Sequence, residues 1–193
     1  MNTVFIEDKT FNKINFNQTL LLKGEYENCV FSTCDFSNVD LSNIKFIFCK
    51  FDHCNLSMAL LDNTAFKNIT FSNSKMLGLR FDQCSTMAFK INIDNCILNH
   101  SSFYKLKLKN TFFKTAQLEE VDFSESDLTA AIFDNSNLQK AVFENSILEK
   151  ADFTTAYNYS LDPERNRIKK AKFSLNGVAG LLSKYNIEID NFK

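Results

Sequence analysis

The stretch VDFSESDLTAAIFDNSNLQKAVFENSILEKADFTT, residues 121–155, places a large apolar side chain at every fifth position. The spacing extends through most of the chain in two runs, from Ile6 to Phe81 and, two residues out of step, from Ile93 to Phe153. A period of five fits neither the period of about 3.6 residues of an α-helix nor the period of 2 of a flat strand. The sequence therefore predicts a repeat protein.

A small side chain usually stands two positions before each large one, as Cys34 does before Phe36 and Ala131 before Phe133. Two inward residues in every five, with polar residues between them, describe a chain that turns a corner every five residues. Segments such as CDFSN, SDLTA, SNLQK and ADFTT resemble the pentapeptide-repeat family, and the resemblance covers residues 6–157. It implies an all-β fold, a right-handed quadrilateral parallel β-helix with about 20 residues per coil.

Residues 20 apart also share their side-chain type, as expected if four repeats complete one coil. Examples are Phe11, Phe31, Phe51 and Phe71 in the first run and Phe113, Phe133 and Phe153 in the second. Each side chain would fill the interior against the coils above and below, so we expect a core that is a column of stacked side chains.

The chain of 193 residues, 45 % of them hydrophobic, is long enough for one domain. We expect the β-helix over residues 1–157, with a register break at 82–92, and a loop, a short α-helix and a terminal strand over 158–193. No run of 18 apolar residues occurs, and the N-terminal residues lack a basic segment followed by an apolar one. These features predict no membrane association and a cytoplasmic location.

Chemistry-bearing residues are sparse. All six cysteines stand two positions before an anchor position of the repeat, where a small inward side chain is needed, which predicts packing thiols, not disulfides or metal ligands. The two histidines, His53 and His100, fall in the outward part of the repeat, and no nucleophile, metal or phosphate motif is present. We therefore expect no enzyme activity, no catalytic residues, no cofactor and no metal.

At the register break, Phe81 and Ile93 are 12 residues apart, where two repeats would give ten. Phe89 therefore falls outside the five-residue pattern. One interpretation is a local bulge that the coil tolerates. The other is a projection that reaches a partner.

Charge alternates along the chain: the net charge is −3 over residues 1–64, +6 over 65–114, −7 over 115–155 and +3 over 156–193. The third segment spans about two coils, and its charge density approaches that of DNA, with about one charge per 1.7 Å of duplex. We predict a partner-binding surface there or, as the alternative, a solvated face that keeps a Phe-rich rod soluble. Its residues are Glu119, Glu120, Asp122, Glu125, Asp127, Asp134, Glu144, Glu149 and Asp152.

The C-terminal segment predicts a helix that Ser174 caps and that carries an apolar stripe. A helix followed by the tail IEI either closes the open end of the β-helix or recruits a second subunit. Val178 to Ile189, VAGLLSKYNIEI, resembles the end of Qnr-type quinolone-resistance proteins. The resemblance implies a homodimer through the C-terminal ends, with candidate contacts at Leu175, Val178, Leu181, Leu182, Tyr185 and Ile187.

Two functions follow. The resemblance to Qnr-type proteins implies a rod that mimics DNA, binds DNA gyrase and topoisomerase IV and protects them from quinolones, without contacting nucleic acid itself. The alternative is a structural scaffold or adaptor that docks another protein through its flat sides.

Overall fold

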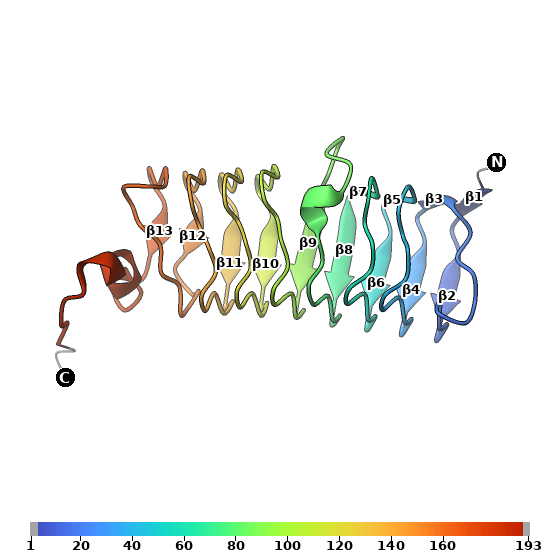
Figure 1. The fold of residues 1–193 in the computed structure, drawn as a ribbon, viewed down its shortest axis with the longest axis horizontal. Helices are drawn as coiled ribbons and strands as arrows, with labels where there is room; N and C mark the ends of the chain where they lie inside the picture. Colours follow the sequence, from blue (N-terminus) through green and yellow to red (C-terminus); the bar gives the residue numbers. More distant parts are fainter. Residues whose placement is uncertain (1–3, 191–193) are drawn as a thin grey trace.

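The computed structural model describes residues 4–190, and these wind into one elongated rod with the termini at opposite ends (Figure 1). All strands pair in parallel with residues 20 positions on, except across the register break, where the offset is 22. Two sheets run along the rod. The first contains β1 (Val4–Glu7), β3 (Gly24–Glu27), β5 (Lys45–Ile47) and β7 (Ala65–Lys67). The second contains β2 (Thr10–Asn12), β4 (Val30–Ser32), β6 (Lys50–Asp52), β8 (Ile69–Ser72), β9 (Ile91–Asp94), β10 (Phe112–Lys114), β11 (Ile132–Asp134), β12 (Asp152–Phe153) and β13 (Lys172–Phe173).

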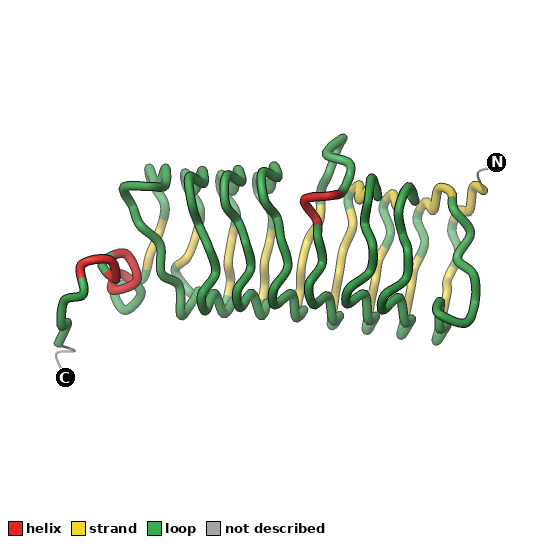
Figure 2. Tube along the Cα trace, viewed as in Figure 1, coloured by secondary structure: helices red, strands yellow, loops and turns green. Residues whose placement is uncertain are grey.

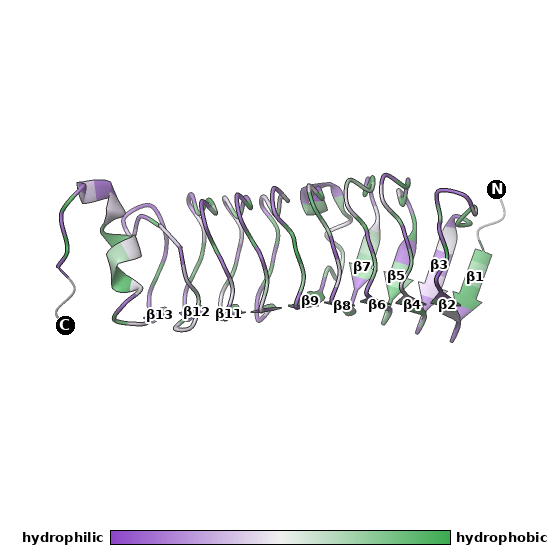
Figure 3. Cartoon of the chain, turned by 90° about the horizontal axis from the view of Figure 1, so that it is seen from below, coloured by the Kyte–Doolittle hydropathy of each residue, from purple (hydrophilic) through white to green (hydrophobic). Residues whose placement is uncertain are grey.

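The large residues of the five-residue period point inward and stack on their counterparts in the next coil. The ring centroids of Phe31 lie 4.8 Å from those of both Phe11 and Phe51, and the rings are nearly parallel. Phe113 and Phe133 lie 5.0 Å apart with 4° between their planes. These distances match the spacing of about 4.8 Å between neighbouring strands, so backbone pairing and ring stacking support each other. Hydrophobic and hydrophilic residues alternate along each coil as a result (Figure 3). The predicted parallel β-solenoid with 20 residues per coil is confirmed.

Most corners are made by the residue two positions after an inward anchor, which adopts a left-handed backbone conformation. Among the described residues, 28 non-glycine residues have positive φ, and 12 of these are asparagines. Asparagine tolerates this region better than other side chains because its short amide bonds locally. Stacked corner asparagines also bond each other, as Nδ2 of Asn63 donates to Oδ1 of Asn43 at 3.0 Å.

The register break forms a 3₁₀ turn, η1 (Phe81–Gln83), followed by a loop over residues 84–90 that projects from the rod (Figure 2). The loop is anchored at both ends by backbone bonds, because N–H of Ser85 donates to Thr64 and N–H of Lys90 donates to Phe66. Phe89 turns back onto the core and packs edge-on against Phe81. β9 then resumes the stack with Ile93 over Phe71. The extra residues are thus absorbed outside the barrel, and Met87 in the loop is 74 % exposed.

The coils continue past residue 157, where the sequence pattern predicts their end. Strand β13 pairs with β12, so residues 158–173 complete one more coil. The five-residue pattern is lost there because Asn158 is the left-handed corner residue and Tyr159, the residue after it, fills the core. Asn166 takes a small-residue position and donates from Nδ2 to the carbonyl of Phe143 at 2.7 Å.

The C-terminal segment differs from the predicted α-helix and strand. It forms two short 3₁₀ helices, η2 (Val178–Leu181) and η3 (Ser183–Tyr185), and residues 187–189 are not in a strand. Gly177 and Gly180 weaken the α-helix, but they let the segment pack against Tyr159, whose atoms a Cβ at either position would overlap. Ser174 does not cap η2, whose N-cap residue is Gly177; its Oγ accepts from N–H of Gly177 at 3.1 Å in the turn before the helix. No helix among residues 4–190 is long and apolar enough to cross a bilayer.

The corners give a stability prediction. Thr115 and Asn135 stack at the same corner with φ near 50°, which suits asparagine and disfavours a β-branched residue. We expect Thr115→Asn to raise the free energy of unfolding by about 1 kcal/mol and the reverse change, Asn135→Thr, to lower it by a similar amount. Urea unfolding of both variants measures this. Equal midpoints for the two variants would contradict the role of the corner.

Candidate functional site

The rod has four sides, which we name after the anchor residues in its middle coils. The Phe113 side carries residues 111–115, the Leu118 side 116–120, the Phe123 side 121–125 and the Leu128 side 126–130, each with its equivalents in the other coils. Anchor side chains point inward, so the residues on either side of an anchor and the corner residue form the surface.

The nine predicted acidic residues do not lie together. Glu119 and Glu120 lie on the Leu118 side, and Asp134 and Asp152 lie on the Phe113 side. Asp127 and Glu149 belong to the Leu128 side, and Asp122, Glu125 and Glu144 to the Phe123 side. The segment is continuous in the sequence but winds around all four sides of the rod.

Most of these carboxylates pair with a cation about one coil away. The ion pairs are Glu120 with Lys140 (2.9 Å), Glu125 with Lys105 (3.4 Å), Asp127 with Lys109 (3.1 Å), Glu144 with Arg165 (3.0 Å), Glu149 with Arg167 (2.6 Å) and Asp152 with Lys172 (3.1 Å). Glu120 also lies 3.2 Å from Nδ1 of His100. The hydrogen bond from Lys140 lowers the pKa of Glu120. Because the acidic segment lies between two basic segments in the sequence, a 20-residue coil stacks opposite charges. The cation of each pair is exposed, so solvent screens the attraction and each pair stabilises the fold only weakly.

The three other acidic residues accept neutral hydrogen bonds. Glu119 accepts from Asn99 at 3.4 Å, and Asp122 accepts from the backbone N–H of Ser124 at 2.8 Å. Asp134 accepts from the side chains of Asn135 and Thr155, both at 2.9 Å.

The Phe123 side has the largest excess of carboxylates over cations. It gathers three of the predicted residues with five others from distant segments, against four cations, Lys23, Arg80, Lys105 and Arg165. The eight carboxylates are Asp40, Asp62, Asp82, Asp122, Glu125, Glu144, Asp162 and Glu164. Sequence reasoning by segment missed the five others. Grouping the residues by their position within the 20-residue coil, with the two-residue insertion included, would have found them.

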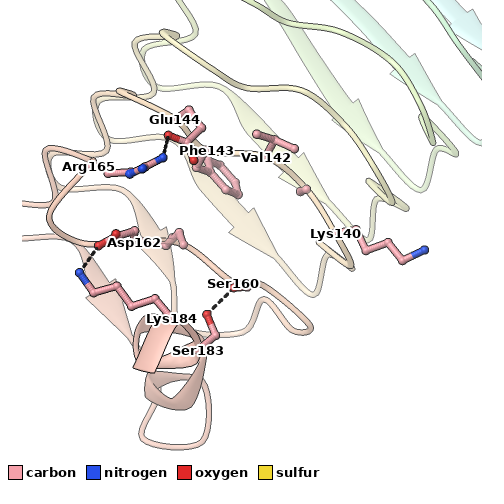
Figure 4. A pocket seen from close by; sticks show the side chains of 11 residues that line it. Lys140, Val142, Phe143, Glu144, Ser160, Asp162, Arg165, Ser183 and Lys184 are labelled. Carbon is pink, nitrogen blue, oxygen red and sulfur yellow. Dashed lines mark hydrogen bonds and ion pairs between the residues drawn. The ribbon is translucent and has the colours of Figure 1, made fainter. Parts of the chain in front are cut away.

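A hollow of about 620 Å³ lies where this side meets the C-terminal segment (Figure 4). Its charged groups satisfy one another: Arg165 pairs with Glu144, and Lys184 pairs with Asp162 at 2.8 Å. The hydroxyls of Ser160 and Ser183 share a hydrogen bond. The hollow therefore presents polar groups that already have partners, which suits a contact surface better than chemistry on a bound substrate.

The six predicted dimerisation residues divide into two groups. Leu175 is 90 % exposed, and Val178, Tyr185 and Ile187 are also exposed. Leu181 packs partly buried against the core, and Leu182 is half-buried. The C-terminal segment thus covers the end of the β-helix with Leu181 and Leu182 and leaves the other four side chains exposed.

The cysteines all lie in the core with free thiols. Burial raises the pKa of the Cys49 and Cys54 thiols to about 12 and that of Cys96 to about 11. Among residues 4–190, no three histidine, cysteine or acidic side chains converge in a way that could hold a metal ion. His53 and His100 are exposed at corners, as the sequence predicts, and each lies beside a carboxylate.

The fold defines a class of protein, a four-sided parallel β-solenoid whose charged side chains lie on its outside. The family model for pentapeptide repeats matches residues 96–135 and 116–154, with eight copies. The chain therefore contains pentapeptide repeats over residues 96–154, and the coils on either side of them have the same architecture.

Solved structures with the same fold include two trypsin-treated forms of QnrB1, a plasmid-mediated fluoroquinolone resistance protein. One matches with a TM-score of 0.60 and 18 % identity, over 97 % of this chain and 98 % of the other. The second matches with a TM-score of 0.62 and 17 % identity, over 98 % of this chain and all of the other. No curated protein sequence matches the chain significantly.

The buried thiols give a second prediction. With a pKa near 12 instead of 9, Cys49 and Cys54 hold about a thousandfold less thiolate at pH 8 than ordinary thiols, because burial disfavours the charged form. We expect Ellman's reagent to modify none of the six cysteines in the folded protein and all six in guanidinium. Rapid reaction of any thiol in the folded protein would contradict their role as packing residues.

Proposed function

We propose that the chain is a non-enzymatic binding protein of the cytoplasm that engages a type II topoisomerase, DNA gyrase or topoisomerase IV, as a mimic of DNA and protects it from quinolones. The observation that carries the proposal is the agreement of fold with QnrB1 over nearly the whole length of both chains. QnrB1 is itself a fluoroquinolone resistance protein.

The Phe123 side supports a role as a DNA mimic. Its eight carboxylates span six coil steps, which is about 30 Å at a strand spacing of about 4.8 Å. The average spacing of about 4 Å per carboxylate is close to the spacing of about 3.4 Å between phosphates along one DNA strand. Six of the eight carboxylates pair with Lys23, Arg80, Lys105, Arg165 or Lys184, which reduces this charge, and Asp62 and Asp122 have no ion pair within the described residues.

The projecting loop offers a second contact. Its backbone is anchored at both ends, and Met87 is exposed beyond the flat side of the rod. An exposed apolar side chain on an anchored loop is a feature that a partner can recognise with little loss of conformational freedom.

A homodimer through the C-terminal ends is part of the proposal. Leu175, Val178, Tyr185 and Ile187 leave apolar surface open at that end of the rod, which a second copy would cover. Two rods joined in this way would extend the acidic side in both directions.

Charge reversal on the Phe123 side tests the topoisomerase role. We expect the wild-type protein to inhibit gyrase supercoiling or to restore it in the presence of ciprofloxacin. We expect Asp62→Lys with Asp122→Lys to weaken the effect at least about tenfold, because like charges would face the DNA-binding surface.

Asp8→Lys with Glu27→Lys is the matched control, since it makes the same charge change on the Leu128 side. Thermal unfolding verifies that both double variants fold. No effect of wild-type protein in excess, with either enzyme, would remove the topoisomerase role.

Sedimentation tests the dimer. We expect the wild-type protein to sediment as a dimer and Leu175→Asp with Ile187→Asp to yield monomers of about 22 kDa, because both side chains are exposed and their replacement leaves the core intact. Leu20→Asp, at an exposed position near the other end, is the control. A dimer that survives the double change places the contact elsewhere on the rod.

A further inference from the structure

The register break also creates a hollow on the Leu128 side, where that side meets the Phe113 side. The hollow has a volume of about 700 Å³ and lies between the foot of the projecting loop and strand β10. Its apolar part includes Phe89, Ile93 and Phe112, and Phe112 is 51 % exposed although the residue after it is an anchor of the core. Phe89 and Lys90 belong to the segment that carries the insertion, so the register break contributes to the shape of this hollow.

Lysines surround this apolar floor. Lys90, Lys107, Lys109 and Lys114 line the hollow, and Asp94 is the one carboxylate among its lining residues. Lys109 pairs with Asp127 at 3.1 Å, and Lys114 pairs with Asp94 at 3.4 Å. Lys90 and Lys107 form no ion pair within residues 4–190, and both are exposed. Their positive charge is therefore available to a ligand that enters the hollow.

We infer that this hollow binds a short acidic segment of a partner protein, with one apolar side chain of the segment seated against Phe112 and its carboxylates facing Lys90 and Lys107. An exposed aromatic ring inside a ring of cations matches a peptide that combines both kinds of group. The volume of the hollow also lies within the range of about 300–1,000 Å³ that is typical of ligand-binding pockets.

The length of the basic surface favours a peptide over a nucleic acid. Along the Leu128 side, Lys67, Lys90 and Lys107, which are unpaired within the described residues, cover two coil steps, about 10 Å. In the coil before them Lys45 pairs with Glu25 at 3.3 Å, and in the coil after them Asp127 reverses the charge. Ten ångströms accommodate about three residues of extended peptide at about 3.3 Å each. Single-stranded nucleic acid needs a longer track, since binding sites on comparable β-folds span about four nucleotides or more.

This inference does not rest on a topoisomerase role. The hollow lies on the Leu128 side, whereas the carboxylates proposed to mimic DNA lie on the Phe123 side. The two surfaces can therefore be altered separately, and the failure of one proposal leaves the other standing.

Fluorescence anisotropy tests the proposal with the full-length chain and a labelled octapeptide, in which a central Leu-Phe pair is flanked by three acidic residues on each side. We expect saturable binding that weakens as salt is raised. Lys90→Glu with Lys107→Glu should weaken it at least about tenfold, and Phe112→Ser at least about fivefold. Lys150→Glu with Lys169→Glu makes the same charge change on other coils of the Leu128 side and should leave binding within about twofold.

Two comparison probes separate the possible outcomes. The first probe is a peptide with two serines in place of the Leu-Phe pair. The wild-type protein should bind this peptide more weakly than the octapeptide, whereas the Phe112→Ser variant should bind the two peptides equally. Oligothymidylate of 12 nucleotides should bind more weakly than the octapeptide. No octapeptide binding, equal loss in the Lys150 and Lys169 variant, or tighter binding of the oligonucleotide that depends on Lys90 and Lys107 would each overturn the proposal.

Discussion

The structure depends on the stacking of each inward side chain on the one 20 residues before it. Rings such as Phe31 and Phe51 lie 4.8 Å apart, which is also the distance at which parallel strands form hydrogen bonds. The chain therefore satisfies its backbone and its core with one repeat length. A repeat protein of this kind is stabilised by contacts between neighbouring coils, so the stack must remain in register from end to end.

The same register arranges the surface. Carboxylates in residues 115–155 and cations in the flanking segments meet in ion pairs because the coil brings them together, as Glu144 meets Arg165 and Asp152 meets Lys172. The two-residue insertion leaves the stack intact, because Ile93 still lies over Phe71. Its extra length appears outside as the projecting loop and the hollow beside Phe112. The features available to partners are consequences of how the register is kept and where it is interrupted.

The sequence predicts the coils well wherever one residue type fills each position. Phe123 and Leu128 mark their sides through simple spacing, and the cysteines follow from their small-residue positions. Residues 158–166 could not be predicted in this way, because Tyr159 and Asn166 maintain the coil through contacts that depend on the folded neighbours. The prediction of a C-terminal α-helix was wrong for a related reason. Gly177 and Gly180 allow close packing on Tyr159, and this contact is not visible in the helix propensity of the segment. The sequence identifies the acidic segment, but the distribution of its residues over four sides follows from the coil and not from their order in the chain.

Deletion of repeats tests the central claim, which is that a 20-residue register and not merely a five-residue period specifies the fold. Removing residues 116–135 takes out one whole coil, so that Phe153 would stack on Phe113 and every later anchor would keep its side. Removing residues 116–130 takes out three repeats and shifts every later anchor by one side. We expect the first deletion to unfold in one cooperative transition with a strand-rich circular dichroism spectrum. We expect the second to lose that transition or to melt at a far lower temperature. Equal stability of the two deletions would contradict the account.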